Sequence, residues 1–239
     1  AGASLGAVIA IALGFTSLGM FYMPAFAFVG AFVSVGITIL LTLRNNKLDT
    51  TTLLLAGVAV SMLLGAFTSG ILTMINEYRL REFLFWMVGG LDFRRWDHVL
   101  LAVGPIMTGS VILMMLGRHL NVLVLGDTEA RALGVPVMVY RMLFLFLSSV
   151  ITATAVCVSG SIGFVGLVVP HIVRLLVGPD HRILLPMAAI GGALFLVFCD
   201  TLGRVVAQPV EIRVGIMTAL LGAPYFLYLL HRLRSKGGA

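Results

Sequence analysis

Ionisable side chains are rare in this sequence, and the few that stand close together are where chemistry is expected. Asp200 and Arg204 lie four residues apart inside an apolar segment. An acid and a base at this spacing share one face of a helix and can form an ion pair. Charged residues inside a membrane are costly, and they often mark a transport pathway. The pair therefore either lines a pathway or holds two helices together, and a position near the outer interface would lower its cost.

The sequence does not indicate an enzyme. There is no H-E-x-x-H motif, and neither Lys47 nor Lys236 lies in a phosphate-binding loop. His171 has no second ligand three or four residues away, which favours a structural role over a haem or metal site. Cys157 and Cys199 both lie in apolar segments and are expected to be small core residues. We expect a non-catalytic protein without a metal or cofactor, so any ATP it uses is hydrolysed by another chain.

One short polar segment, residues 125–135, stands between two strongly apolar stretches. Asp127 is expected to cap a two-turn helix, with Glu129 favoured by its positive start and Gly134 supplying a left-handed end. Asp127 and Arg131 lie four residues apart and can pair. Such a helix either presents a mixed surface to a soluble partner or is an ordinary connector at the membrane interface.

The composition indicates an integral membrane protein. Of 239 residues, 60% are hydrophobic and 11% are charged, whereas soluble domains carry roughly 25% charged residues. A helical span needs about 20 apolar residues, and eight segments qualify: 2–19, 25–43, 53–75, 98–117, 137–158, 161–176, 183–206 and 214–231. None alternates as barrel strands do. The predicted fold class is an all-α, polytopic bundle of membrane helices.

The basic residues predict which loops are cytoplasmic. With the carboxyl terminus placed inside, the cytoplasmic loops and ends contain Arg44, Lys47, Arg118, Arg131, Arg141, Arg174, Arg182, Arg232, Arg234 and Lys236 against Asp49, Asp127, Glu129 and Asp180. On the other side, Arg79, Arg81, Arg94, Arg95, Arg204 and Arg213 balance Glu77, Glu82, Asp92, Asp97, Asp200 and Glu211. The whole net charge of +6 therefore falls on one side. It reflects topology and not nucleic-acid binding.

Two segments carry small residues at every fourth position, namely Gly57, Ser61, Gly65 and Ser69 in one, and Gly2, Gly6, Ala10 and Gly14 in the other. Such stripes let helix backbones approach closely in lipid. Packing within the bundle is the favoured interpretation for each, and a dimer seam or the wall of a pathway is the alternative.

Residues 76–97 are too long for a simple hairpin, and their apolar run is too short to span. Because tryptophan favours the membrane interface, this segment predicts a short helix lying at the outer surface. Its four arginines are either headgroup anchors or docking charges for an acidic partner.

Several motifs resemble those of one transporter family. Residues 159–174 (SGSIGFVGLVVPHIVR), residues 178–182 (GPDHR) and the Leu185-Pro186 pair closely resemble the FecCD-type permeases. These are the membrane subunits of ABC importers for ferric siderophores, haem and cobalamin. The resemblance extends over essentially the whole chain, through residues 85–90 (FWMVGG), 126–135, Asp200, Arg204 and 215–224 (GIMTALLGAP).

The resemblance implies an importer subunit in a bacterial or archaeal cell membrane, the inner one in Gram-negative cells. Its implied partners are a cytoplasmic ATPase dimer, a second permease copy and an extracytoplasmic substrate-binding protein. Family members have ten spans, and the eight here resemble the third to the tenth. Residues 1–239 are therefore expected to form one permease domain that lacks its first two helices, and a first residue other than Met agrees with an amino-terminal truncation.

The resemblance also implies roles for particular residues. The expected coupling helix, residues 125–135, would contact the ATPase through Gly126, Asp127, Thr128, Glu129, Ala130, Arg131, Leu133 and Gly134. The family usually has Glu where this chain has Asp127, a conservative departure. Candidates for the pathway or an intramembrane pair are Asp200, Arg204, Gly57, Ser61 and Gly65, and those for docking the binding protein are Arg79, Arg81 and Arg213.

The expected function is ATP-driven import of an iron chelate, either a ferric siderophore or haem, or of cobalamin. A secondary transporter or channel without an ATPase is the alternative, and the scarcity of intramembrane acids argues against it. An intramembrane enzyme is disfavoured because no catalytic constellation is present.

Overall fold

The computed structural model describes residues 1–43, 50–92 and 94–236, and these residues form helices and no strands. The charged residues at positions 44, 47 and 49, on which the predicted orientation partly rests, lie outside this part of the chain. The side chains at 232, 234 and 236 also lie outside it. The helices are α1 (Gly2–Ala12), the 3₁₀ turn η1 (Phe15–Ser17), α2 (Tyr22–Thr42), α3 (Thr50–Leu72), α4 (Glu77–Val88), α5 (Trp96–Met115), α6 (Gly117–Val124), α7 (Asp127–Ala132), α8 (Val137–Ser159), α9 (Val165–Val177), α10 (His181–Val206) and α11 (Val214–Lys236).

Each of the eight predicted spans coincides with an apolar helix, but the helices differ in length. Five of them, α2, α3, α5, α8 and α10, are long and apolar enough to cross a membrane, whereas α1, α9 and the apolar part of α11 are shorter. In each of the five, between 11 and 22% of the apolar window is buried. Most residues of these windows are therefore at least partly accessible, as helices in contact with lipid require.

Two predicted span boundaries are wrong. The first helix stops at Ala12 instead of residue 19, because Gly14 takes a left-handed φ of 77° and begins η1. The sixth begins at Val165 instead of residue 161, because Gly160 ends α8 with a φ of 73° and residues 161–163 are not helical. In both places a glycine ends a helix that apolar composition alone would continue.

The predicted outer helix is present as α4. Asn76 caps its start by accepting a hydrogen bond from the Arg79 backbone amide at 3.0 Å. Phe83 and Trp86 of α4 are buried in a core cluster that includes Val8 and Ile11 of α1. This helix therefore packs on α1, and its 12 residues are too few to cross a membrane.

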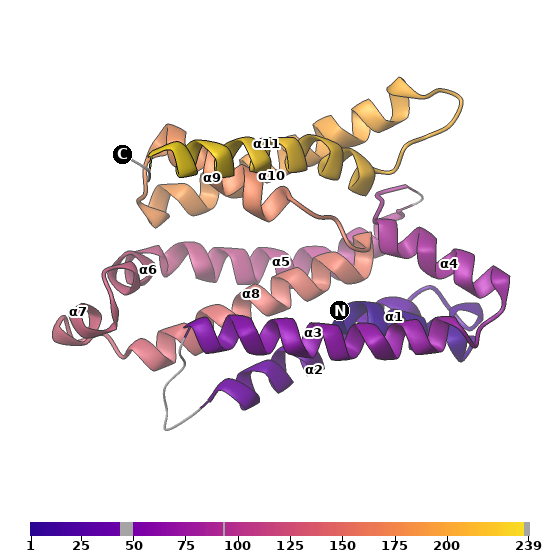
Figure 1. Cartoon of the computed structure of the whole chain (residues 1–239), viewed down its shortest axis with the longest axis horizontal. Helices are drawn as coiled ribbons and strands as arrows, with labels where there is room; N and C mark the ends of the chain where they lie inside the picture. The colour runs from indigo at the N-terminus through magenta and orange to yellow at the C-terminus, as the bar shows by residue number, and fades with distance from the viewer. Residues whose placement is uncertain (44–49, 93, 237–239) are drawn as a thin grey trace.

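The helices form three groups (Figure 1). α9, α10 and α11 lie together on one side of the molecule, α1, α2 and α3 lie on the other, and α5 and α8 run between them. Valines 169 and 173 of α9 pack with Leu184 of α10, whereas Cys199 of α10 packs with Val214 and Met217 of α11. Cys157, in the α1–α4 cluster, and Cys199 are both buried and free, which confirms their prediction as core residues.

The glycine stripe of α1 packs within the chain, as predicted. A Cβ atom added at Gly2 would overlap the Gly30 carbonyl oxygen of α2, and one at Gly6 would overlap the Phe26 carbonyl oxygen. The two backbones are thus in contact, as small-residue stripes permit.

Four glycines from three separate motifs meet where α4, α8 and α11 adjoin. The Gly90 amide donates to the Ser159 carbonyl at 2.8 Å, and the Gly215 amide donates to the Gly89 carbonyl at 3.3 Å. A Cβ at Gly160 would overlap the Trp86 carbonyl oxygen. We call this contact of residues 86–90, 159–160 and 215 the glycine junction. It joins the helix groups by backbone contacts, and a Cβ at Gly89, Gly160 or Gly215 would overlap a backbone carbonyl.

The two ends of the bundle are unlike. Figure 1 shows α6, α7 and the carboxyl terminus at one end and α4 at the opposite end. This separation agrees with the loops that the sequence assigns to opposite sides of the membrane, although which side is cytoplasmic stays a prediction.

Candidate functional site

The polar segment forms the short helix α7, but its start differs from the prediction. Gly126, with a φ of 120°, occupies the N-cap position, and Asp127 is the first helical residue. The expectation that Asp127 caps the helix is therefore wrong. Asp127 and Glu129 still lie in the first turn, where the positive end of the helix dipole favours acidic groups.

The end of α7 matches the prediction. Gly134 has a left-handed φ of 78°, and its amide donates to the Arg131 carbonyl at 2.9 Å. The Val135 amide donates to the Ala130 carbonyl at 3.0 Å. These two bonds form a Schellman motif, which satisfies carbonyl groups that a helix end would otherwise leave free.

α7 has one buried residue and an exposed remainder. Ala130 is fully buried, while Asp127, Thr128, Glu129, Arg131 and Leu133 are exposed. A six-residue helix with so little buried surface is not stable by itself, so its position depends on contacts with the spans.

The first of these contacts joins α7 to α8. The Arg141 guanidinium donates two hydrogen bonds to the Asp127 carboxylate, at 2.6 and 3.3 Å. A two-pronged arginine–carboxylate pair fixes orientation as well as distance. Asp127 therefore pairs with a residue 14 positions away on a span, and the expected pairing with Arg131 is wrong.

The second contact joins α6, the helix preceding α7, to the start of α10. The Asn121 side chain donates to the Asp180 carboxylate at 2.7 Å and accepts from the His181 backbone amide at 2.9 Å. The His181 ring nitrogen Nδ1 lies 2.7 Å from the same Asn121 oxygen. Asp180 also caps α10 through the Arg182 amide at 2.9 Å. We call these residues, 121 and 180–182, the α6–α10 clamp.

The Asp180 carboxyl of the clamp is ionised at neutral pH. The backbone amide of Arg182, and after it the side-chain amide of Asn121, lower the pKa of Asp180 below its ordinary value. A carboxyl whose pKa is lowered in the folded protein keeps its charge until the pH falls through that lowered value. The clamp therefore holds its charged hydrogen bonds at neutral pH.

An aromatic contact supports α6 from the side of α8. The His119 ring stacks on the Tyr140 ring with centroids 4.2 Å apart. Tyr140 is adjacent to Arg141, so α6 and α7 contact the same turn of α8. The short helices are thus held to two different spans.

At the opposite end, Asp200 and Arg204 form the predicted ion pair. Arg204 Nε donates to the Asp200 carboxylate at 2.8 Å, and a second guanidinium nitrogen lies 3.7 Å from the Asp92 carboxylate. Asp92 belongs to the connection between α4 and α5. The pair therefore links α10 to a neighbouring connection, which supports the helix-holding interpretation, and its role in a pathway stays untested.

The three candidate docking arginines differ in their contacts. Arg79 donates to the Ala12 carbonyl at 2.7 Å, at the end of α1. Arg213 donates to the Phe85 carbonyl and lies over the Phe85 ring, 4.6 Å from its centroid. Both hold α4 in place. Arg81 is exposed on α4, so among the three it is best placed for an outside partner.

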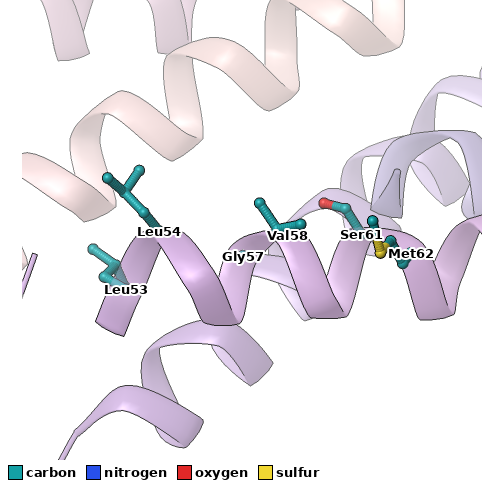
Figure 2. Close-up of a pocket in the computed structure, with 6 residues that line it drawn as sticks. All are labelled: Leu53, Leu54, Gly57, Val58, Ser61 and Met62. Atoms are coloured by element: carbon teal, nitrogen blue, oxygen red, sulfur yellow. The ribbon is translucent and has the colours of Figure 1, made fainter. Parts of the chain in front are cut away.

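The small-residue stripe of α3 behaves differently from that of α1. A Cβ at Gly65 would meet nothing within 4 Å, and one at Gly57 would only touch the Thr38 side chain at 3.9 Å. Gly57 and Ser61 line an open groove of about 550 Å³ with Leu53, Leu54, Val58 and Met62. Figure 2 shows the side chains of Leu54, Val58 and Ser61 projecting from one side of α3. Packing within the chain was the favoured interpretation, but this stripe lies on an unpacked face.

Sequence reasoning missed the residues that hold α6 and α7. Arg141 and Asn121 are ordinary polar residues in apolar surroundings, and their partners lie 14 to 60 residues away. Only Asp180, a capping residue ahead of an apolar run, carried a local signal. Within the described residues, no group of three His, Cys, Asp or Glu side chains is placed to hold a metal ion.

Comparison with known proteins agrees with this architecture. The profile of the FecCD transport family matches residues 1–232. The chain belongs to the FecCD transport family.

Curated relatives within the FecCD family carry transport names. The cobalamin import system permease protein BtuC of Halobacterium salinarum is 46% identical over 96% of this chain and 61% of the relative. The hemin transport system permease protein HmuU of Yersinia pestis is 46% identical over 87% of this chain and 63% of the relative. The chain thus spans about three fifths of these relatives. Both are named as permease proteins, which agrees with the prediction of a transport permease subunit.

A solved structure shows the same fold. An inward-facing metal-chelate type ABC transporter superposes with a TM-score of 0.89 and 33% sequence identity, covering 97% of this chain and 73% of that one. The all-α membrane fold is confirmed. Together with the apolar helices, the family establishes a multi-pass membrane protein.

Proposed function

We propose that this chain is the permease domain of a binding-protein-dependent ABC importer, and that α7 couples it to a cytoplasmic ATPase dimer. The observation that carries the proposal is the way α7 is held. It is short, charged and exposed, yet Asp127 is fixed to α8 by two hydrogen bonds and the adjoining α6 is fixed to α10. A helix that only connected two spans would need neither contact.

The contacts suggest how ATP drives access to the pathway. Closure of the ATPase dimer would push on the exposed residues of α7, and the Asp127–Arg141 pair would transmit that force to α8. The unpacked face of α3, with Gly57, Ser61 and Gly65, would line the pathway between two copies of the permease. The chain supplies the change in access, and ATP hydrolysis occurs on the partner.

The proposed substrate class is a metal chelate. The named relatives include cobalamin and hemin permeases, which supports both the predicted haem and the cobalamin alternative. A ferric siderophore also belongs to this class. The chelate would be delivered by an extracytoplasmic binding protein docked over α4, with Arg81 the leading contact.

The proposed location is the cell membrane of a bacterium or archaeon, with the carboxyl terminus and α7 in the cytoplasm. The basic residues assigned to that side support this orientation. They include Arg118, Arg131 and Arg182, which lie in or beside α6, α7 and the start of α10.

The test is a charge reversal on α7, Asp127→Lys with Glu129→Lys, in the full-length protein assembled with its ATPase in proteoliposomes. The probes are cyanocobalamin and haemin. We expect uptake per ATP hydrolysed to fall about tenfold, the usual size of a coupling effect, while membrane insertion stays intact. Unchanged transport would contradict the assignment of α7, and uptake that continues without ATP would favour a secondary transporter.

A matched variant separates contact with the ATPase from the internal pair. Asp127→Arg combined with Arg141→Asp preserves the ion pair but reverses the charge that α7 presents. If the ATPase reads Asp127 directly, this double variant stays uncoupled. If Asp127 serves only to hold α7 on α8, the double variant recovers coupling.

A further inference from the structure

The α6–α10 clamp is built more strongly than a connector between two helices requires. One asparagine side chain makes contacts of 2.7 to 2.9 Å to two consecutive residues that lie 59 and 60 positions further along the chain. One of them, Asp180, is charged, and hydrogen bonds to charged groups are stronger than neutral ones. The backbones also meet, because a Cβ at Gly117 would lie 3.3 Å from the Arg182 Cα atom.

α10 connects this clamp to the other end of the bundle. Its 26 residues span about 39 Å at 1.5 Å per residue. At the far end, Arg204 pairs with Asp200 and reaches Asp92 of the α4–α5 connection, and the Ile212 amide donates to the Gly203 carbonyl at 3.0 Å. Movement of the first turn of α10 is thus connected to the surface around α4.

We propose that Asn121 is a positioning residue that carries movement of the coupling segment into α10, separately from the Asp127–Arg141 route into α8. The inference rests on the proposed function, because it needs an ATPase that moves α6 and α7. It assigns two routes, in which α8 follows α7 through Arg141 and α10 follows α6 through Asn121. Residues 207–213, which follow α10, respond through the second route.

The test compares nucleotide-induced changes in hydrogen exchange in the full-length protein bound to its ATPase. The reporter for α10 is the segment 207–213, and the reporter for α8 is the segment 160–164. In the wild type, we expect ATP with vanadate to change exchange in both segments. In Asn121→Ala, the change at 207–213 is lost and the change at 160–164 remains, while ATPase binding is retained.

Three further variants make the result specific. Asn121→Asp places two carboxylates together and should also abolish the α10 response. Adding Asp180→Asn to it returns one amide and one carboxylate to the pair with their positions exchanged, and should recover the response. Asn76→Ala, which removes the asparagine that caps α4 at the other end of the bundle, is the matched control and should leave both responses unchanged.

Several outcomes would overturn this inference. They are an α10 response that survives Asn121→Ala, an equal loss in Asn76→Ala, and no recovery in the exchanged pair. Loss of ATPase binding in Asn121→Ala would instead assign the residue to the docking surface and overturn a transmitting role. A wild-type protein that binds no ATPase would overturn the proposed function as well, which distinguishes the two failures.

Discussion

At the scale of single residues, charge on this protein is used mostly to join elements. Arg79 holds the end of α1, Arg141 holds α7, and Arg213 holds α4. Each links residues far apart in sequence. An arginine that makes such contacts is a poor choice for an outside partner, because binding would have to compete with them.

Among the three docking candidates, Arg81 is therefore the one whose reversal should affect docking alone. We expect Arg81→Glu to slow association with the cognate binding protein about tenfold, since exposed charges act mainly on association rates. Surface plasmon resonance on the reconstituted protein measures this rate, and the effect should weaken as salt is raised. Thermal stability should not change.

Arg213→Ala provides the contrast, because it removes the contacts to Phe85 and should lower the melting temperature in detergent. If Arg81→Glu left association unchanged at low salt, the docking assignment on α4 would be wrong.

At the scale of elements, the hydropathy pattern predicts the helices themselves but not the contacts between them. Eight apolar helices, the outer helix α4 and the glycine end of α7 follow from local composition and spacing. The early end of α1 and the late start of α9 depend on the backbone angles at Gly14 and Gly160, which composition does not reveal.

The polar contacts between elements could not be predicted from local sequence patterns, and the reason is physical. Spacing rules apply within one helix, and they favoured Arg131 as the partner of Asp127. The folded chain instead places Arg141 of α8 there. The clamp at Asn121 likewise depends on how α6 and α10 pack, so no local pattern contains it.

The glycine junction yields a prediction about stability. Gly160→Ala should lower stability by at least about 1 kcal/mol, because alanine at a left-handed φ is strained and its Cβ would overlap the Trp86 carbonyl. Gly163→Ala is the matched control, since nothing lies within 4 Å of a Cβ there. Thermal unfolding in detergent should separate the two by about 2–4 °C. Equal melting temperatures would show that the junction is not tightly packed.

At the scale of the whole molecule, two unlike ends are joined by spans that have contacts at both. The α6–α7 end carries the exposed coupling segment and the clamp, and the α4 end carries the glycine junction and the Arg204 contacts. Because the chain belongs to the FecCD transport family, we interpret this arrangement as one that serves transport. Apolar faces such as that of α3 are left for lipid, a pathway or a second copy.

The central claim is that α7 is where an ATPase binds. The most direct measurement is affinity purification of the full-length protein in mild detergent, beside a variant whose residues 126–135 are replaced by a Gly/Ser linker. We predict that a P-loop ATPase co-purifies in near-stoichiometric amount with the wild type and is lost from the variant. An ATPase retained by a well-folded variant, or absent from both samples, would contradict the account.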